Sequence, residues 1–543
     1  MLLMLLLLFL SQYPEYVTDT VRVLGTRLPP GFSGAMTSLW ITDSAWISRL
    51  PGQSVDQALL FSPGIHTVNR GLPGVQSDIS VGSGNYTQIA IMVNGIRCED
   101  PQTAHHSADV PLGISDIERI EIARGGASSL AGTGASSGAV NLATSDPVLG
   151  TRSEAFAESF GTAGGRMEIG NGNLSLGFSG ARSDGPWRGS DYGLWRVSQK
   201  TSLGRARAFA SYSWKGFGAK DFYAPYPSRE WTSCGLFTLN WQGFSFGARR
   251  HTDRFVLLED DPGFYENNHL KTSAICSWSA GMGPGFGGWE ISWWELLSNR
   301  LGYHHAPGAA VFYQAGLGFG PFAFVVGARE DWREGTGFAP NLNGGISCAF
   351  GEVRGRASGS LATRFPSATE MYYQDPGNTG NPGLLPEKTK RAEMGLEWRW
   401  IGLGTFAVDF EDLIDWAKNP EGIWEARNIN GLRAYGAWAE IKSRWIFLGW
   451  WYQKRFLDEE YESKYALRTP SNSVKVGTPW LFLSWEDGTC LVSGQFSVTK
   501  GHFSLSLFGD NLLNQSWEPV PGLHGPPRRL GVGLSFSTSS QGS

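Results

Sequence analysis

Strict alternation of apolar and polar residues over many short segments constrains the fold of this chain more than any other feature. The alternation runs from about residue 150 almost to the C-terminus and is clearest in 208–214, 237–241, 492–498, 503–507 and 530–536. Because successive side chains of a strand point to opposite faces of a sheet, a period of two residues predicts β-strands. We therefore expect this part of the chain to form a large, mainly β structure.

The polar faces of these segments distinguish between two β architectures. A β-sandwich would alternate in the same way. Here, however, the polar positions carry charges and amides, as a water-filled lumen would, and Tyr and Trp often lie near the segment ends, as in the aromatic girdles of membrane barrels. Charged residues make up only 17% of the chain, which also has 23 Trp and 72 Gly. These features favour a transmembrane antiparallel β-barrel, and a net charge of -5 gives no sign of a nucleic-acid partner.

A different pattern occupies residues 114–144, ahead of the alternating region. Residues 117–124 alternate with charges on both faces, a run of glycine and small residues follows, and 139–144 forms a second short apolar segment. Periodicity alone predicts a strand, a glycine-rich turn and a second strand, which many α+β domains contain.

The full text of this stretch resembles the end of the plug domain of TonB-dependent outer-membrane transporters. The match is carried by Ile117-Glu-Arg-Ile-Glu-Ile122, Arg124-Gly125 and Val140-Asn-Leu-Ala-Thr144. The chain departs from the usual pattern at Gly126, Ala131 and Ser137. Further resemblance lies in the barrel stretches 364–395, 412–430 and 511–536.

The resemblance implies a domain organisation. Residues 40–146 are expected to form a mixed α/β plug inside a 22-stranded antiparallel barrel built from 147–543. Within the plug, Ser54 and Gln57 predict a capping box for a helix around 55–60, and Asn94-Gly95 predicts a hairpin turn.

The N-terminal segment carries two short signals. The apolar run Met1–Leu10 is too short to span a bilayer, which takes about 20 residues, so residues 1–12 are interpreted as a signal-peptide remnant. In the segment 13–39, one stretch resembles a TonB box, which offers an unpaired strand to a partner's sheet; an ordinary linker strand is the alternative. The box residues are Asp19, Thr20, Val21, Arg22 and Val23.

The plug loops supply the candidate substrate-facing residues, which are Asn85, Tyr86, Gln102, His105 and His106. Adjacent histidines on an extended chain point to opposite faces, so this pair cannot readily chelate one ion. We therefore expect a polar loop without metal, and no cofactor. The five cysteines lie far apart, without zinc-site or redox spacing.

Charged residues are expected to hold the plug in place. A plug with a large apolar interface could not move under a modest pull, so its surface toward the lumen should be polar. In the family, plug arginines pair with barrel glutamates. Carried over by motif, the plug members are Arg119, Glu121 and Arg124, and the barrel members Glu387 and Glu393. The alternative is that these charges are satisfied within the plug.

No nucleophile elbow, phosphate loop or zinc-ligand spacing indicates an enzyme. The resemblance implies active import of a scarce nutrient by an outer-membrane monomer, driven by a TonB-type protein on the periplasmic side. A siderophore-type metal chelate or cobalamin is the expected substrate. A passive porin, an adhesive barrel and a barrel enzyme are the rival classes, and none of them needs a plug of about 100 residues or a TonB box.

Overall fold

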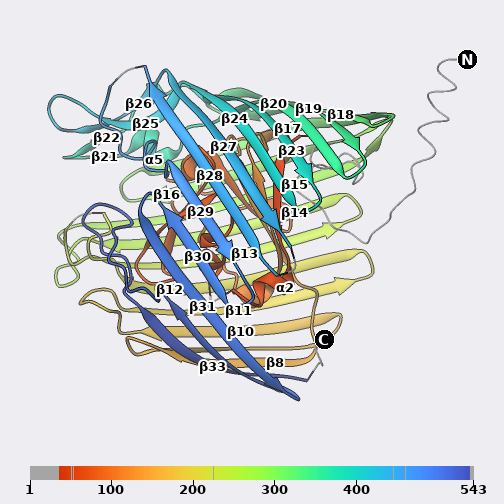
Figure 1. The fold of residues 1–543 in the computed structure, drawn as a ribbon. Coiled ribbons are helices and arrows are strands. Elements are labelled where there is room, and N and C mark those ends of the chain that lie inside the picture. The colour runs from red at the N-terminus through yellow and green to blue at the C-terminus, as the bar shows by residue number, and fades with distance from the viewer. Residues whose placement is uncertain are drawn as a thin grey trace, which may run out of the picture.

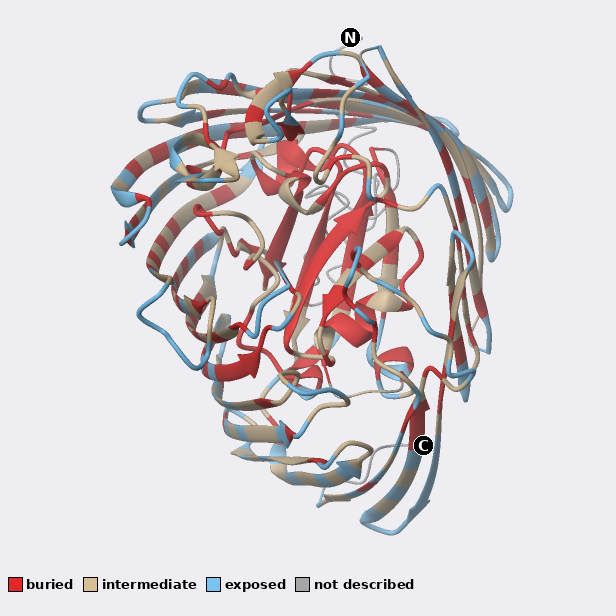
Figure 2. Ribbon diagram, turned by 90° about the vertical axis from the view of Figure 1, so that its left-hand side faces the viewer, coloured by how far each residue is buried: buried red, intermediate tan, exposed pale blue. Residues whose placement is uncertain are grey.

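The computed structural model describes residues 36–538 except 51, 53, 224, 444 and 459. The box-like residues Asp19–Val23 therefore lie outside the described residues. Within the described part, 22 antiparallel strands close into a barrel, and a smaller mixed domain lies inside it (Figures 1 and 2). The predicted fold class is confirmed. No helix among the described residues is long and apolar enough to cross a membrane.

The barrel strands follow one another in chain order, and β33 pairs with β8 to close the wall. The first half comprises β8 (Leu149–Glu158), β9 (Thr162–Asn171), β10 (Leu174–Ser183), β11 (Tyr192–Leu203), β12 (Ala206–Gly218), β13 (Arg229–Trp241), β14 (Phe244–Val256), β15 (Glu266–Met282), β16 (Gly285–Ser298), β17 (Gly302–Phe319) and β18 (Phe322–Arg333). The second half comprises β19 (Gly337–Phe350), β20 (Val353–Arg364), β23 (Glu387–Trp398), β24 (Ile401–Glu411), β27 (Leu432–Lys442), β28 (Phe447–Leu457), β29 (Asn472–Gly477), β30 (Leu481–Glu486), β31 (Thr489–Lys500), β32 (Phe503–Asp510) and β33 (Arg529–Ser537).

The alternation in the sequence becomes a difference between the two faces of the wall. Leu505, Leu507 and Leu534 are each at least half exposed, because they point outward from the barrel. In Figure 2 buried and exposed positions alternate along many wall strands, whereas the domain in the lumen is largely buried. An outward apolar band and an inward polar face are what a lipid-spanning barrel requires.

The two ends of the barrel differ in the length of their connections. At one end the turns are short, such as residues 204–205 between β11 and β12. At the other end, α5 (Ala368–Tyr372), β21 (Gln374–Asp375), β22 (Asn378–Thr379), β25 (Leu413–Lys418) and β26 (Trp424–Ile429) lie in long connections, and their strands form a four-stranded sheet. Outer-membrane barrels keep their short turns on the periplasmic side, so the long connections face outward.

The plug is built on a five-stranded sheet in the order β1-β6-β7-β4-β5. These strands are β1 (Ser38–Thr42), β4 (Ile89–Val93), β5 (Ile96–Arg97), β6 (Ile117–Arg124) and β7 (Gly138–Thr144). A separate hairpin of β2 (Ile65–Arg70) and β3 (Gln76–Val81), the helices α2 (Ser44–Ile47), α3 (Val55–Leu60) and α4 (Ser128–Ala131), and the short 3-10 turns η2 (Tyr86–Gln88) and η3 (Ile114–Asp116) complete the plug.

Local sequence signals in the plug were mostly correct. The helix expected around 55–60 is α3, but the capping box is wrong, because the Ser54 hydroxyl donates to Gln57 Oε1 at 3.2 Å instead of capping the helix. Asn94 and Gly95 have φ of 53° and 78°, which is the geometry of a type I′ hairpin turn.

The expectation of a wholly polar plug surface is wrong, because apolar side chains of the plug pack against the wall in more than one place. Trp46 and Phe61 of the plug contact Phe447 and Phe482 of the wall, with ring centroids 5.1 Å apart for Trp46–Phe447 and 5.5 Å apart for Phe61–Phe482. Phe447 is the first residue of β28 and Phe482 the second residue of β30, and both strands start from short turns. This aromatic contact therefore lies near the short-turn end. The interface therefore combines polar contacts with apolar ones.

Candidate functional site

Arg124 at the end of β6 joins the plug to the barrel wall. Its Nη2 donates to Glu440 Oε2 on β27 at 2.7 Å and to the Ser38 hydroxyl within the plug at 2.5 Å. The guanidinium also lies 5.1 Å from the ring centroid of Trp438. Arg124 is almost fully buried. A buried charge of this kind needs its partner, since removing one member leaves the other uncompensated.

The barrel partners expected for the plug arginines are corrected by the structure. Glu393 pairs with Arg391 at 2.8 Å and with Arg356, both of which belong to the wall. Glu387 pairs with Arg364 of the wall at 3.2 Å, but its other oxygen accepts from Gln88 of the plug at 2.5 Å. Motif position located inward-facing glutamates but not their partners, because pairing depends on which strand the plug faces.

Two other charged residues of β6, Arg119 and Glu121, pair with each other inside the plug. Arg119 Nε donates to Glu121 Oε1 at 2.7 Å, and Asn141 donates to the other carboxylate oxygen at 3.1 Å. The alternative interpretation of internal pairing therefore describes Arg119 and Glu121, whereas Arg124 reaches the wall.

A hydrogen-bonded group lies on the outward side of the plug, close to the long connections. Arg70 donates to Asp78 Oδ2 at 2.5 Å, and His105 Nδ1 lies 2.8 Å from Asp78 Oδ1. Tyr86 stacks on His105 at 4.2 Å between ring centroids and contacts its Nε2 through the hydroxyl at 3.0 Å. Burial alone would raise the pKa of Asp78, but Arg70 and His105 lower it to about 2, so Asp78 is ionised.

The connection between β28 and β29 covers this group. Tyr465 from that connection packs edge-on against Tyr86 at 5.5 Å, and Arg468 lies beside it. The cavity between plug and connection measures about 40 Å³. Ligand pockets usually measure about 300–1,000 Å³, so the connection has to move before a chelate could bind here.

The five predicted substrate-facing residues separate into two groups. Tyr86 and His105 are partly exposed beside the outward cavity. Asn85, Gln102 and His106 are buried. Asn85 caps the 3-10 turn that follows it, and Gln102 accepts from Lys271 of the wall at 2.8 Å. Gln102 thus makes a supporting contact in place of the expected exposure to substrate, whereas Asn85 both caps the turn and lines the outward cavity.

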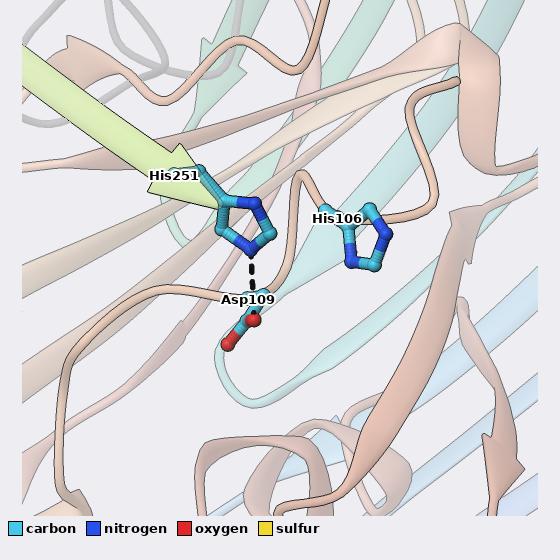
Figure 3. A group of neighbouring side chains, drawn as sticks. All are labelled: His106, Asp109 and His251. Atoms are coloured by element: carbon cyan, nitrogen blue, oxygen red, sulfur yellow. Dashed lines mark hydrogen bonds and ion pairs between the residues drawn. The ribbon is translucent and has the colours of Figure 1, made fainter. Parts of the chain in front are cut away.

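His106 lies close to His251 of the barrel wall (Figure 3). Its ring lies 4.8 Å from that of His251 on β14, and His251 Nε2 donates to Asp109 Oδ2 at 3.0 Å. The Nε2 atom of His106 is 3.8 Å from Glu230 Oε1 on β13 and 3.9 Å from Asp253 Oδ1 on β14. Burial and the charge of Lys271 hold the pKa of His106 well below its ordinary value, so the ring is neutral.

The sequence did not identify this histidine–carboxylate cluster. The alternation of side chains along an extended segment correctly separated the rings of His105 and His106. Apart from Asp109, however, the other members of the cluster come from wall strands more than 100 residues away in sequence. The available signal was weak: polar residues such as His251 and Asp253 recur at every second position of an inward-facing strand.

A closed 22-stranded barrel whose lumen is filled by a plug domain is the architecture of a gated outer-membrane transporter or receptor. Comparison with known families agrees: residues 34–139 match the TonB-dependent receptor plug domain, and residues 122–522 match the TonB-dependent receptor-like β-barrel. The chain belongs to the TonB-dependent receptor family and is an outer-membrane protein. This family consists of transporters and receptors that take up nutrients, not of enzymes.

Individual relatives are distant in sequence. The vitamin B12 transporter BtuB of Photobacterium profundum is 22% identical over 550 residues, which cover 87% of this chain and 84% of that protein. The siderophore receptor PirA from Pseudomonas aeruginosa superposes with a TM-score of 0.68 at 17% identity, covering 94% of this chain and 99% of PirA. The FrpB iron transporter from Neisseria meningitidis superposes with a TM-score of 0.70 at 13% identity, covering 92% of this chain and 99% of FrpB. These structural likenesses concern the fold.

Proposed function

We propose that this chain imports cobalamin or a related metal chelate across the outer membrane, as a monomer, in an energised step that displaces the plug. The observation that carries the proposal is the way the plug is held. It fills the lumen, so passive diffusion is blocked, yet many of its contacts with the wall are ion pairs and hydrogen bonds. A pull can exchange such contacts for contacts with water more readily than it can separate an extended apolar interface.

The energy for import comes from the inner membrane through a TonB-type protein, and no nucleotide is needed at the outer membrane. The segment Asp19–Val23 is the proposed contact, because an unpaired strand can add to the edge of the partner's sheet. The substrate class is supported by the likeness to a vitamin B12 transporter along most of the chain. Tyr86 and His105, with Tyr465 above them, are the proposed first contacts of the substrate.

The coupling step is tested by replacing Val21 with proline. Proline removes one backbone donor and fixes φ, so the segment can no longer pair along its whole length. We expect energised uptake of radiolabelled cobalamin by cells to be lost, while binding of cobalamin to the same cells stays at the wild-type level.

Phe32→Pro, in the same N-terminal segment but beyond the box, is the matched control and should leave uptake unchanged. Wild-type uptake by the Val21→Pro variant would place the coupling contact elsewhere. Absence of cobalamin binding by the wild type, with a siderophore bound instead, would change the substrate and leave the coupling proposal intact.

A further inference from the structure

The histidine–carboxylate cluster at His106 has the composition of a metal site. Two groups of three side chains bring their ligand atoms within 4.8 Å of one another: His106, Asp109 and His251, and His106, Glu230 and Asp253. His106 belongs to both groups and comes from the plug, whereas Glu230, His251 and Asp253 come from wall strands β13 and β14. The cluster therefore bridges the plug and the barrel.

The spacing of the second group is close to that of a bound ion. His106 Nε2 lies 3.8 Å from Glu230 Oε1 and 3.9 Å from Asp253 Oδ1. Around a tetrahedral ion with bonds of about 2.0–2.1 Å, neighbouring ligand atoms lie about 3.3 Å apart. Small side-chain rotations would close this difference. These separations are also too long for direct hydrogen bonds.

Orphaned atoms provide a second, independent observation. Glu230 is only 2% exposed, and its Oε2 has no hydrogen-bond partner among the described residues. His251 is fully buried, and in the same part of the chain its Nδ1 also has no hydrogen-bond partner. Because His251 donates through Nε2 to Asp109, its Nδ1 carries a free lone pair, 3.9 Å from Asp253 Oδ1. Buried polar atoms without partners are costly, and a cation among them would remove that cost.

Two lysines already pair with carboxylates of the cluster. Lysine–carboxylate pairing without a metal ion is therefore the competing interpretation. Lys271 lies 2.9 Å from Asp253 Oδ1, and Lys215 lies 2.9 Å from Asp109 Oδ1. Lys271 has other partners, however, since it donates to Gln102 and lies 3.4 Å from Asp100. It can therefore retain contacts when Asp253 turns to an ion. Among the described residues, the basic side chain within 4 Å of a Glu230 carboxylate oxygen is His106, and no lysine lies that close.

We propose that His106, Glu230 and Asp253 bind one divalent transition-metal ion that fastens the plug loop to the barrel wall. Mixed imidazole and carboxylate ligands suit zinc and its first-row neighbours better than calcium or magnesium, which prefer oxygen alone. Since His106 is the plug's ligand and the others belong to the wall, the ion cross-links the two domains. The site is separate from the proposed substrate contacts at Tyr86 and His105.

The experiment is calorimetric titration of Zn²⁺ into the detergent-solubilised full chain after dialysis against a chelator. We expect saturable binding of one Zn²⁺ per chain. Titration with Co²⁺ should give visible absorption bands of a low-coordinate site with nitrogen ligands. Glu230→Gln keeps the shape of the side chain and should weaken binding by at least the roughly 10- to 100-fold typical of losing a supporting group at a metal site. His106→Ala should abolish it.

His66→Ala is the matched control, because His66 is another plug histidine facing a wall glutamate, Glu486, at 2.6 Å. It should bind one Zn²⁺ with wild-type affinity. Far-UV circular dichroism checks that each variant is folded. The proposal is overturned if folded wild-type protein shows no saturable Zn²⁺ binding, or if Glu230→Gln and His106→Ala both bind as the wild type does. Either result assigns the cluster to lysine–carboxylate pairing alone.

Discussion

At the scale of single residues, Arg124 and Glu440 determine how firmly the plug is held at one side. Breaking a buried pair costs about 3–5 kcal/mol, because the remaining charge is left uncompensated. Arg124→Ala should therefore let the barrel open at a lower denaturant concentration, measured as ion conductance across planar bilayers. Glu440→Ala should give a similar shift, and the double variant should open no more readily than the worse single one.

The control is Arg207→Ala, which removes an exposed arginine paired with exposed Asp146. Exposed substitutions usually change stability by less than about 0.5 kcal/mol. An Arg124→Ala barrel that opens no earlier than Arg207→Ala would show that this pair does not act as a latch.

Asp415 lies on β25 in the outer four-stranded sheet and contacts the connection between β28 and β29. It makes this outer region sensitive to pH. Burial raises its pKa from 3.8 to about 6, although Ser463 and Tyr461 donate to it. Because the pKa of Asp415 is higher in the folded than in the unfolded chain, the protonated carboxyl stabilises the fold. This stabilisation is fully present below about pH 4 and is lost as the pH rises through 6, and its size is on the order of 3 kcal/mol. Amides of 413–418 should exchange hydrogen faster at pH 7 than at pH 5, after correction for intrinsic rates. Asp415→Asn should show the same protection at both pH values.

At the scale of elements, the pairing of β6 with β7 needs glycine at one position. A Cβ at Gly138 would lie 2.4 Å from the backbone oxygen of Ala123, and neither backbone can move without breaking the ladder. Gly138→Ala should destabilise the plug by roughly 1–3 kcal/mol. Proteolysis of folded protein within 117–144 should accelerate accordingly. Gly113→Ala, where the nearest atom would be 3.4 Å away, is the control and should be cleaved as slowly as wild type.

The elements that sequence predicted correctly are those set by local pattern. Alternation gave the wall strands, and Asn94-Gly95 gave the hairpin because two positive φ values suit those residues. Contacts across the interface were not accessible in the same way. Which wall residue meets Arg124 depends on strand tilt and on the rotation of the plug in the barrel, and no local pattern encodes either. The same holds for the partners of His106.

At the scale of the whole molecule, the interface combines two kinds of contact. Ion pairs such as Arg124–Glu440 can exchange partners with water, whereas the contact of Trp46 with Phe447 and Phe482 resists separation. The aromatic contact lies near the short-turn end of the barrel. We therefore expect the ion pairs to exchange early and the aromatic contact to separate last when the plug is displaced.

The central claim is that import requires the plug to move relative to the wall, and a reversible tether tests it most directly. Ile96 on β5 faces Gly247 on β14, where an added Cβ would lie 3.4 Å from the Cβ of Ile96. Disulfides need about 3.5–4.5 Å between these atoms. The Ile96→Cys, Gly247→Cys double variant should bind cobalamin but not import it when oxidised, and reductant should restore import. Each single cysteine variant serves as a control and should import under both conditions. Wild-type import by cells whose double variant is fully cross-linked, as verified by mass spectrometry, would contradict the account.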